Sequence, residues 1–289
     1  MPRSLLPCLA PPLFVVIWAT GFVVARLVAP YAEPLSFLLL RYGLAIVVLT
    51  AVALAVRATW PRTLEAWRDG LVAGVLLHGC YLGGVFWAVR HGLPAGIAAL
   101  VAGLQPLATG LLVGPLLGER VTRRRWVGIA IGFVGGLLVV APKIGAADGF
   151  PPLPLAVCLF AMLSITCGTV WQKRTGGGAD LRTHTVVQYL GAALVTLPLA
   201  LLTEEGRIDF APALWIGLLW AVFGLSIGAI GLLLALIRRG AVAGVAALLY
   251  LVPPVSALMA YGLFGETLAP VQVGGMVLAA AGVALASRG

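Results

Sequence analysis

The sequence predicts an all-helical integral membrane protein whose ten transmembrane helices form two inverted five-helix repeats. Three observations carry this prediction: the composition, ten long apolar segments, and a repeat at half the chain length. Of the 289 residues, 61% are hydrophobic and only 10% are charged, whereas a soluble domain carries about 25% charged residues. The surface of the protein therefore faces lipid, and the bilayer is its first predicted partner.

Ten segments are long and apolar enough to be membrane spans, which need about 20 residues each. The gaps between them are short and rich in proline, glycine and charge, as expected of loops. The predicted spans are 11–29, 34–55, 70–90, 95–117, 124–141, 152–172, 184–202, 212–237, 243–264 and 270–287.

The positive charges of the chain set its predicted orientation. The formal net charge is +9, but the basic residues lie in the short gaps between apolar segments, so we expect no nucleic-acid partner. With a cytoplasmic N-terminus, fourteen of the 19 Lys and Arg residues fall on the cytoplasmic side and three on the outer side. Cytoplasmic loops carry such an excess, so both termini are predicted to be cytoplasmic.

A repeat divides the chain in two. The segment Gly96–Glu119 (GIAALVAGLQPLATGLLVGPLLGE) returns as Gly244–Glu266 (GVAALLYLVPPVSALMAYGLFGE), at offsets of 148 and then 147 residues. We therefore predict a first five-helix repeat at 1–147 and a second at 148–289. Because five is odd, the second copy enters the membrane from the opposite side, as in secondary transporters whose site lies between inverted repeats.

Several function classes are disfavoured by what the sequence lacks. The ten acidic residues all fall in loops or at span ends, so no mid-span carboxylate is available to a cation/proton antiporter. No GxxxxGK[ST] sequence for ATP is present. The four cysteines, Cys8, Cys80, Cys158 and Cys167, show no metal-ligand spacing. We expect no catalytic residues, no metal and no cofactor.

Polar and aromatic side chains inside the spans are the candidate substrate-binding residues. His78 and Tyr81 share one helical face; His78 either contacts substrate or is a neutral histidine bonded to a neighbouring helix. Trp18 and Trp171 occupy equivalent faces of two repeats, with an interfacial tryptophan as the alternative for each. Gln188 begins the seventh span and is open to either interpretation.

Mid-span prolines recur in both repeats and mark predicted hinges. Gln105 precedes Pro106, and Tyr250 lies one turn before Pro254. Proline removes a backbone donor and frees a carbonyl one turn earlier; membrane helices accept this where protein, water or ligand meets the freed group. We therefore predict hinges at Pro106 and Pro254, and assign Gln105 and Tyr250 to the substrate-binding set.

Two further features concern packing. Arg41 lies inside the second span, and we expect its side chain to snorkel to the interface, as we do for Arg26. The glycine-rich segments 128–136 and 274–282 make small-residue faces, which allow close helix contact. We expect these faces to pack the fifth and tenth spans together within one monomer; the alternative is dimerisation.

The segments GIAAL…QP…GE and GVAALL…PP…GE, each followed by a glycine-rich span, resemble the EamA family of the drug/metabolite transporter superfamily. Trp18–Ala19–Thr20–Gly21 fits the start of that pattern. Within the family, the layout is most similar to YddG-type aromatic amino-acid exporters. The resemblance implies a basket-like ten-helix fold around a central cavity, and export of aromatic and other neutral amino acids.

The sequence therefore predicts a multi-pass transporter of the bacterial inner membrane, not an enzyme, that exports amino acids and related small metabolites by alternating access. A carrier of nucleotide sugars, drugs or another metabolite class is the main alternative. An integral membrane enzyme is a further alternative, but it would need a polar catalytic cluster. A scaffold subunit could have uniformly apolar spans without the symmetric mid-span prolines.

Overall fold

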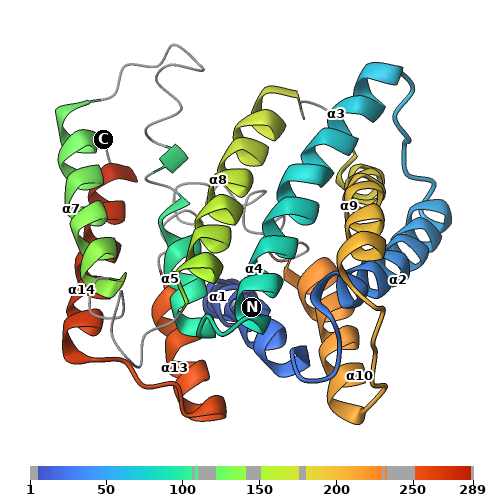
Figure 1. Ribbon diagram of the computed structural model, residues 1–289. Coiled ribbons are helices and arrows are strands. Elements are labelled where there is room, and N and C mark those ends of the chain that lie inside the picture. The colour runs from blue at the N-terminus through green and yellow to red at the C-terminus, as the bar shows by residue number, and fades with distance from the viewer. Residues whose placement is uncertain are drawn as a thin grey trace.

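The computed structural model describes residues 6–105, 108–109, 122–140, 151–175, 180–229, 232 and 251–287. Within these ranges the chain is helical, with one isolated bridge between Ala32 and Ile208 and no strand. The helices, shown in Figure 1, are α1 (Leu6–Val28), α2 (Pro34–Ala55), α3 (Leu64–Gly74), η1 (Val75–Cys80), α4 (Tyr81–Arg90), α5 (Ala95–Gly103), α7 (Arg123–Val140), α8 (Pro152–Thr175), α9 (Leu181–Thr203), α10 (Pro212–Leu219), η3 (Trp220–Ala229), α13 (Val252–Phe264) and α14 (Pro270–Ser287).

Helix is present in each of the ten predicted spans. Among the described residues, six helical stretches are long and apolar enough to cross a membrane, and shorter apolar helices lie at 126–138, 252–264 and 270–282. Large hydrophobic side chains remain exposed on their outer surfaces; Leu202, for example, is 82% exposed. Exposed apolar area of this extent is a liability in water and suits a lipid environment.

Some helices begin earlier than the hydropathy pattern predicts. The third span was expected to start at residue 70, but α3 begins at Leu64, where the Thr63 hydroxyl accepts a hydrogen bond from the backbone N–H of Ala66 at 3.2 Å. Similarly, α9 begins at Leu181 rather than 184, because the Asp180 side chain accepts from the backbone N–H of Arg182 at 3.0 Å. These polar caps satisfy free N–H groups and extend each helix beyond its apolar part.

Equivalent helices of the two predicted repeats occur at the same spacing in the structure. An offset of 147 carries α2 to 181–202 and α7 to 270–287, which coincide within one residue with α9 and α14. The same offset carries η1 to 222–227, inside η3. Both copies of this helix thus switch to π-helical hydrogen bonding at the same place. Such segments inside α-helices are often found at functional sites.

The packing is reciprocal between the two halves. Helices from corresponding predicted spans contact each other in three pairs: α2 with α9, α5 with α13, and α7 with α14. The rod formed by α3, η1 and α4 packs on α8 and α9, while the equivalent rod of α10 and η3 packs on α1 and α2. Figure 1 shows α7 and α14 side by side at one edge of the molecule and α2 near α9 at the other.

Glycine brings α7 and α14 into backbone contact. A Cβ atom added at Gly282 would lie 2.2 Å from the Gly132 nitrogen, and one at Gly135 would lie 2.3 Å from the Ala279 nitrogen. No side chain fits in such a contact. The prediction that the glycine faces pack these two helices together within one chain is therefore confirmed.

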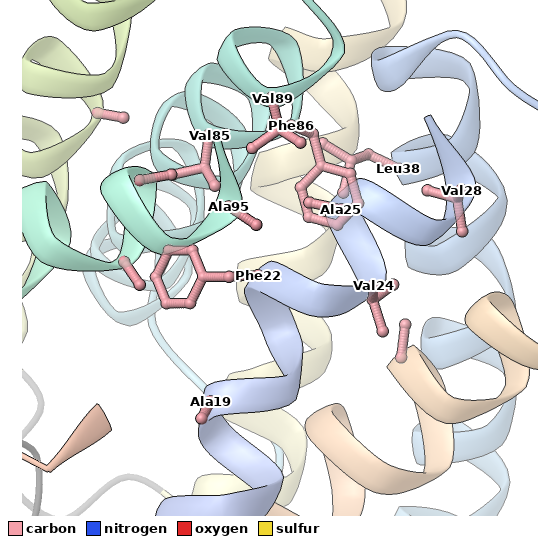
Figure 2. Packing of buried hydrophobic residues seen from close by; sticks show 14 of the residues in the cluster. Ala19, Phe22, Val24, Ala25, Val28, Leu38, Val85, Phe86, Val89 and Ala95 are labelled. Atoms are coloured by element: carbon pink, nitrogen blue, oxygen red, sulfur yellow. The ribbon is translucent and has the colours of Figure 1, made fainter. Parts of the chain in front are cut away.

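Apolar side chains from α1, α2, α4 and α5 form a close-packed core beside these helices. Figure 2 shows Phe22 and Ala25 of α1 near Val85 and Phe86 of α4. The Phe86 ring also stacks on Phe37 of α2, with 5.6 Å between the ring centroids. Core packing of this kind orients the helices that carry polar side chains elsewhere.

A carboxylate joins the end of α13 to the start of α5. The Glu266 carboxylate accepts hydrogen bonds from the backbone N–H groups of Ala95 at 3.1 Å and Gly96 at 3.2 Å. Arg26 of α1 lies 3.7 Å from the same carboxylate. We expected Arg26 to snorkel, with a gating pair as the alternative; its side chain is 45% exposed and also pairs with Glu266, an anion that the N-terminus of α5 favours.

Candidate functional site

Six polar or aromatic side chains gather where α2, η1, α9 and η3 meet. We call this group the polar cluster. Its members are Arg41 and Tyr42 of α2, His78 of η1, Gln188 and Tyr189 of α9, and Ser226 of η3.

His78 and Gln188 are the centre of the polar cluster. The His78 Nε2 atom lies 3.3 Å from the Gln188 Oε1 atom, and a protonated Nε2 donates to that oxygen. The His78 ring packs on the Tyr189 ring with 4.7 Å between centroids. The hydroxyl of Tyr42 donates to the His78 backbone carbonyl at 2.9 Å. Three helices thus converge on one histidine.

Glycines explain how His78 and Gln188 come so close. A Cβ atom added at Gly74 would lie 1.9 Å from the Gln188 carbonyl oxygen, and one at Gly191 would lie 2.2 Å from the Leu71 carbonyl oxygen. The backbones of α3 and α9 therefore touch one turn before His78. Small residues at membrane-helix contacts permit this approach.

Tyr189, Ser226 and Arg41 form the other half of the polar cluster. The Tyr189 hydroxyl donates to the Ser226 Oγ atom at 2.6 Å, and that Oγ donates to the Ala221 carbonyl at 3.0 Å. The Arg41 Nη2 atom is 3.4 Å from the same Oγ atom. Among the described residues, the Arg41 Nε atom has no hydrogen-bond partner. Buried polar atoms are rarely left in this state.

The burial of Arg41 corrects the sequence prediction. We expected its side chain to snorkel to the interface, but the residue is only 6% exposed. Sequence position gives the depth of a residue in a span, but not the side of the helix on which it lies. Here the side chain is directed toward Ser226 on a neighbouring helix.

The remaining predicted residues lie apart from His78. Trp18 is half-buried on α1, with its ring 5.4 Å from Phe14. Tyr81 is half-buried at the start of α4 and packs against the apolar core. The Tyr81 backbone N–H donates to the His78 carbonyl, but in the described part of the chain no side-chain hydrogen bond or ring contact links Trp18 or Tyr81 to the His78 ring.

Gln105 and Trp171 contact other helices. The Gln105 side-chain amide donates to the Thr169 hydroxyl of α8 at 3.0 Å. The Trp171 indole N–H donates to the Asp69 backbone carbonyl at 3.2 Å, which ties α8 to α3. Trp171 therefore has a structural partner in addition to any role toward substrate.

The predicted hinges are described in part. Pro254 is half-buried in α13 and, with Pro253, Leu100 and Met276, lines a small pocket between α5, α13 and α14. Pro106 and Tyr250 lie outside the described residues. The predicted sites and hinges stay predictions, although two of the predicted residues, His78 and Gln188, are in direct contact.

Sequence reasoning missed Tyr42, Ser226 and the burial of Arg41. One signal was available: Arg41 and Tyr42 are adjacent polar residues inside an apolar segment, and intramembrane ionisable groups usually have a function. For a metal, the described residues offer no group of three or more His, Cys, Asp or Glu side chains. The polar cluster therefore contains hydrogen-bonding side chains, buried aromatic rings and one arginine.

A family comparison decides the class of protein. The model of the EamA-like transporter family matches residues 8–141 and again residues 153–288. The chain belongs to the EamA-like transporter family. It is therefore a multi-pass membrane transporter rather than an enzyme, as the sequence predicted.

Individual relatives extend over nearly the whole chain. The chain is 30% identical to the probable amino-acid metabolite efflux pump of Salmonella typhimurium, over 94% of this chain and 91% of that protein. It is also 30% identical to the uncharacterized inner membrane transporter YedA of Escherichia coli, over 89% of this chain and 82% of that protein. A solved crystal structure, 18% identical, shares the fold with a TM-score of 0.65 over 96% of this chain and 95% of the other.

Proposed function

We propose that this EamA family member is a secondary transporter of the bacterial inner membrane that exports amino acids, aromatic and other neutral ones, by alternating access. The observation that carries the proposal is the polar cluster. It combines aromatic rings, a hydrogen-bonded His–Gln pair and a cation, and no described acidic side chain contacts it. Aromatic surface with a few well-placed polar groups is typical of small-molecule sites.

The proposed architecture is ten helices in two inverted repeats, 1–147 and 148–289, with both termini in the cytoplasm. The matching helix bounds, the reciprocal packing and the paired π-helical segments support it. Two family matches, one in each half, agree with the division. In such transporters one repeat rocks against the other around a fixed site.

Within this architecture, His78 and Gln188 supply polar contacts to the substrate. Trp18, Tyr81 and Tyr250 offer aromatic surface to the substrate, and Gln105 and Trp171 line the rest of the substrate-binding cavity. Pro106 and Pro254 are the proposed hinges. The position of Pro254 at a small pocket between α5, α13 and α14 supports its proposed role as a hinge.

The names of the relatives support the substrate class and the membrane. One is named for efflux of amino-acid metabolites and another for the inner membrane. Metabolites with a phosphate, such as nucleotide sugars, are the second candidate class, because the buried Arg41 would also suit that anion. Cationic drugs fit less well, since no acidic residue lies mid-span in the sequence.

The test is counterflow in proteoliposomes preloaded with unlabelled amino acid, using labelled Phe, Trp, Thr and Met. We expect saturable uptake by the wild type and a loss of about tenfold in Tyr81→Ala, the effect of about 1.4 kcal/mol of binding energy. Tyr261→Ala is the matched control, because Tyr261 is 61% exposed on α13. Absence of flux with every amino acid would refute the proposed substrate class.

A further inference from the structure

Arg41 is a buried cation whose hydrogen-bonding capacity is largely unused. A guanidinium carries five N–H donors and stays protonated in proteins. In the described structure, its one hydrogen bond is the 3.4 Å contact from Nη2 to the Ser226 Oγ atom, and Nε has no partner. At 6% exposure, the side chain has little contact with solvent.

Ser226 is a poor partner for Arg41. Its Oγ atom already accepts the 2.6 Å bond from the Tyr189 hydroxyl and donates to the Ala221 carbonyl at 3.0 Å. The longer contact from Arg41 is therefore weak by geometry. Ser226 also carries no charge, so the positive charge of Arg41 is not compensated there.

The acidic residues of the described chain do not compensate Arg41 either. Their hydrogen bonds and ion pairs lie at helix ends and in loops: Glu204 holds the start of α2, Glu266 the start of α5, and Asp69 contacts Arg68. None of them forms an ion pair with Arg41. A buried charge without a counter-ion is strongly unfavourable and is usually retained for function.

The groups around Arg41 indicate which kind of ligand would satisfy its free N–H donors and its charge. A carboxylate matches the planar fork of a guanidinium and forms two parallel charge-assisted hydrogen bonds with it. The Tyr42 and Tyr189 rings, stacked with centroids 5.6 Å apart, are fully buried and form the apolar part of the same cluster. Gln188 belongs to the same cluster, where its Oε1 atom contacts His78 and its amide nitrogen is a further donor.

We infer that Arg41 binds the carboxylate of the transported amino acid. This inference rests on the proposed function and names the chemical group by which the transporter selects its substrate. A substrate must then carry an anion: the zwitterionic amino acid is accepted, while its amide and its decarboxylated amine are rejected. A bound carboxylate supplies the counter-ion that Arg41 lacks, so the empty site is the less stable state.

The test uses competition against counterflow of labelled phenylalanine in proteoliposomes. Unlabelled phenylalanine, phenylalaninamide and phenethylamine are compared in the wild type, in Arg41→Gln and in Arg90→Gln. Arg90 is the matched control, because it is exposed at the end of α4. We expect phenylalanine to compete about 30-fold better than either analogue in the wild type and the control, as a charge-assisted pair would give, and less than about threefold better in Arg41→Gln.

The wild-type comparison needs no variant, so poor folding of Arg41→Gln does not decide the result. Equal competition by phenylalaninamide in the wild type would overturn the role of Arg41 while amino-acid transport stands. A full preference for the carboxylate in folded Arg41→Gln would overturn it as well. Absence of counterflow with any amino acid in the wild type would overturn the proposed function and this inference together.

Discussion

The polar cluster and the contact between α7 and α14 are both places where the two halves of the chain meet, yet they are held together differently. Between α7 and α14, glycines bring backbone against backbone, with no room for a Cβ atom at Gly282 or Gly135. In the polar cluster, Gly74 also brings α3 against α9, but polar side chains then make the contacts between the helices, and two π-helical segments contribute to them.

The difference indicates that the two regions have different roles, one in stability and one in substrate binding. Backbone contacts without side chains have one arrangement and exclude alternatives, because interiors are close-packed. Hydrogen-bonded side chains exchange partners by rotating about single bonds, and a cation with spare donors can take up a ligand. We therefore assign stability to the α7–α14 contact and substrate binding to the polar cluster. Substitutions in the two regions should affect different measurements.

The largest expected effect is on folding, at the α7–α14 contact. Gly282→Val places a Cβ atom 2.2 Å from the Gly132 nitrogen, and overpacking of this kind costs about 3 kcal/mol. We expect little folded protein, measured as the monodisperse fraction after size-exclusion chromatography in mild detergent. Gly274→Val on the same helix is the control, because nothing lies within 4 Å of a Cβ there. Equal yields for the two variants would remove the distinction between the regions.

A substitution in the polar cluster is expected to affect folding less than Gly282→Val does and to affect transport more than folding. Gln188→Leu keeps the volume but removes the 3.3 Å contact with His78, which contributes about 1 kcal/mol to stability. We expect a nearly unchanged melting temperature, with amino-acid counterflow reduced about tenfold. Gln172→Leu, near the end of α8, should match the wild type in both assays. A Gln188→Leu protein with lost stability and normal transport per folded molecule would reverse the assignment.

The smallest expected effect is at the joint between α13 and α5. Glu266→Gln keeps an oxygen for the N–H groups of Ala95 and Gly96 but removes the ion pair with Arg26, whose side chain is 45% exposed. Partly exposed pairs contribute less than about 1 kcal/mol and weaken with salt. We expect a small fall in melting temperature at low salt that disappears at high salt. A large fall in melting temperature at every salt concentration would mean that this contact between α13 and α5 also stabilises the fold.

The sequence predicted the helices well because the membrane imposes a long apolar run on each span. Helix occurs in all ten predicted segments, and the glycine faces pack α7 on α14 as expected. The polar caps at Thr63 and Asp180 lengthen two helices beyond the apolar signal. Hydropathy reports the apolar part of a helix, not the polar turn in front of it.

The candidate site was predictable only in part. His78 and Gln188 were visible as polar residues within apolar runs, but their contact depends on how α3 and η1 cross α9, which glycines decide at Gly74. The π-helical segments are not visible in the hydropathy pattern, so we predicted interruptions of the helices at the prolines instead. Arg41 was misplaced because depth in a span does not give the rotation of the helix.

Protection of Cys80 from alkylation tests the central claim, that substrate binds in the polar cluster, most directly. Cys80 ends η1, is half-buried, and lies two residues after His78. In a chain that keeps only this cysteine, phenylalanine should slow the reaction with a small maleimide about tenfold, with half-protection at the concentration that half-saturates counterflow. A chain that keeps only the exposed Cys167 should show no protection. Alkylation of Cys80 that is unchanged by phenylalanine, in a protein that still transports it, would contradict the account.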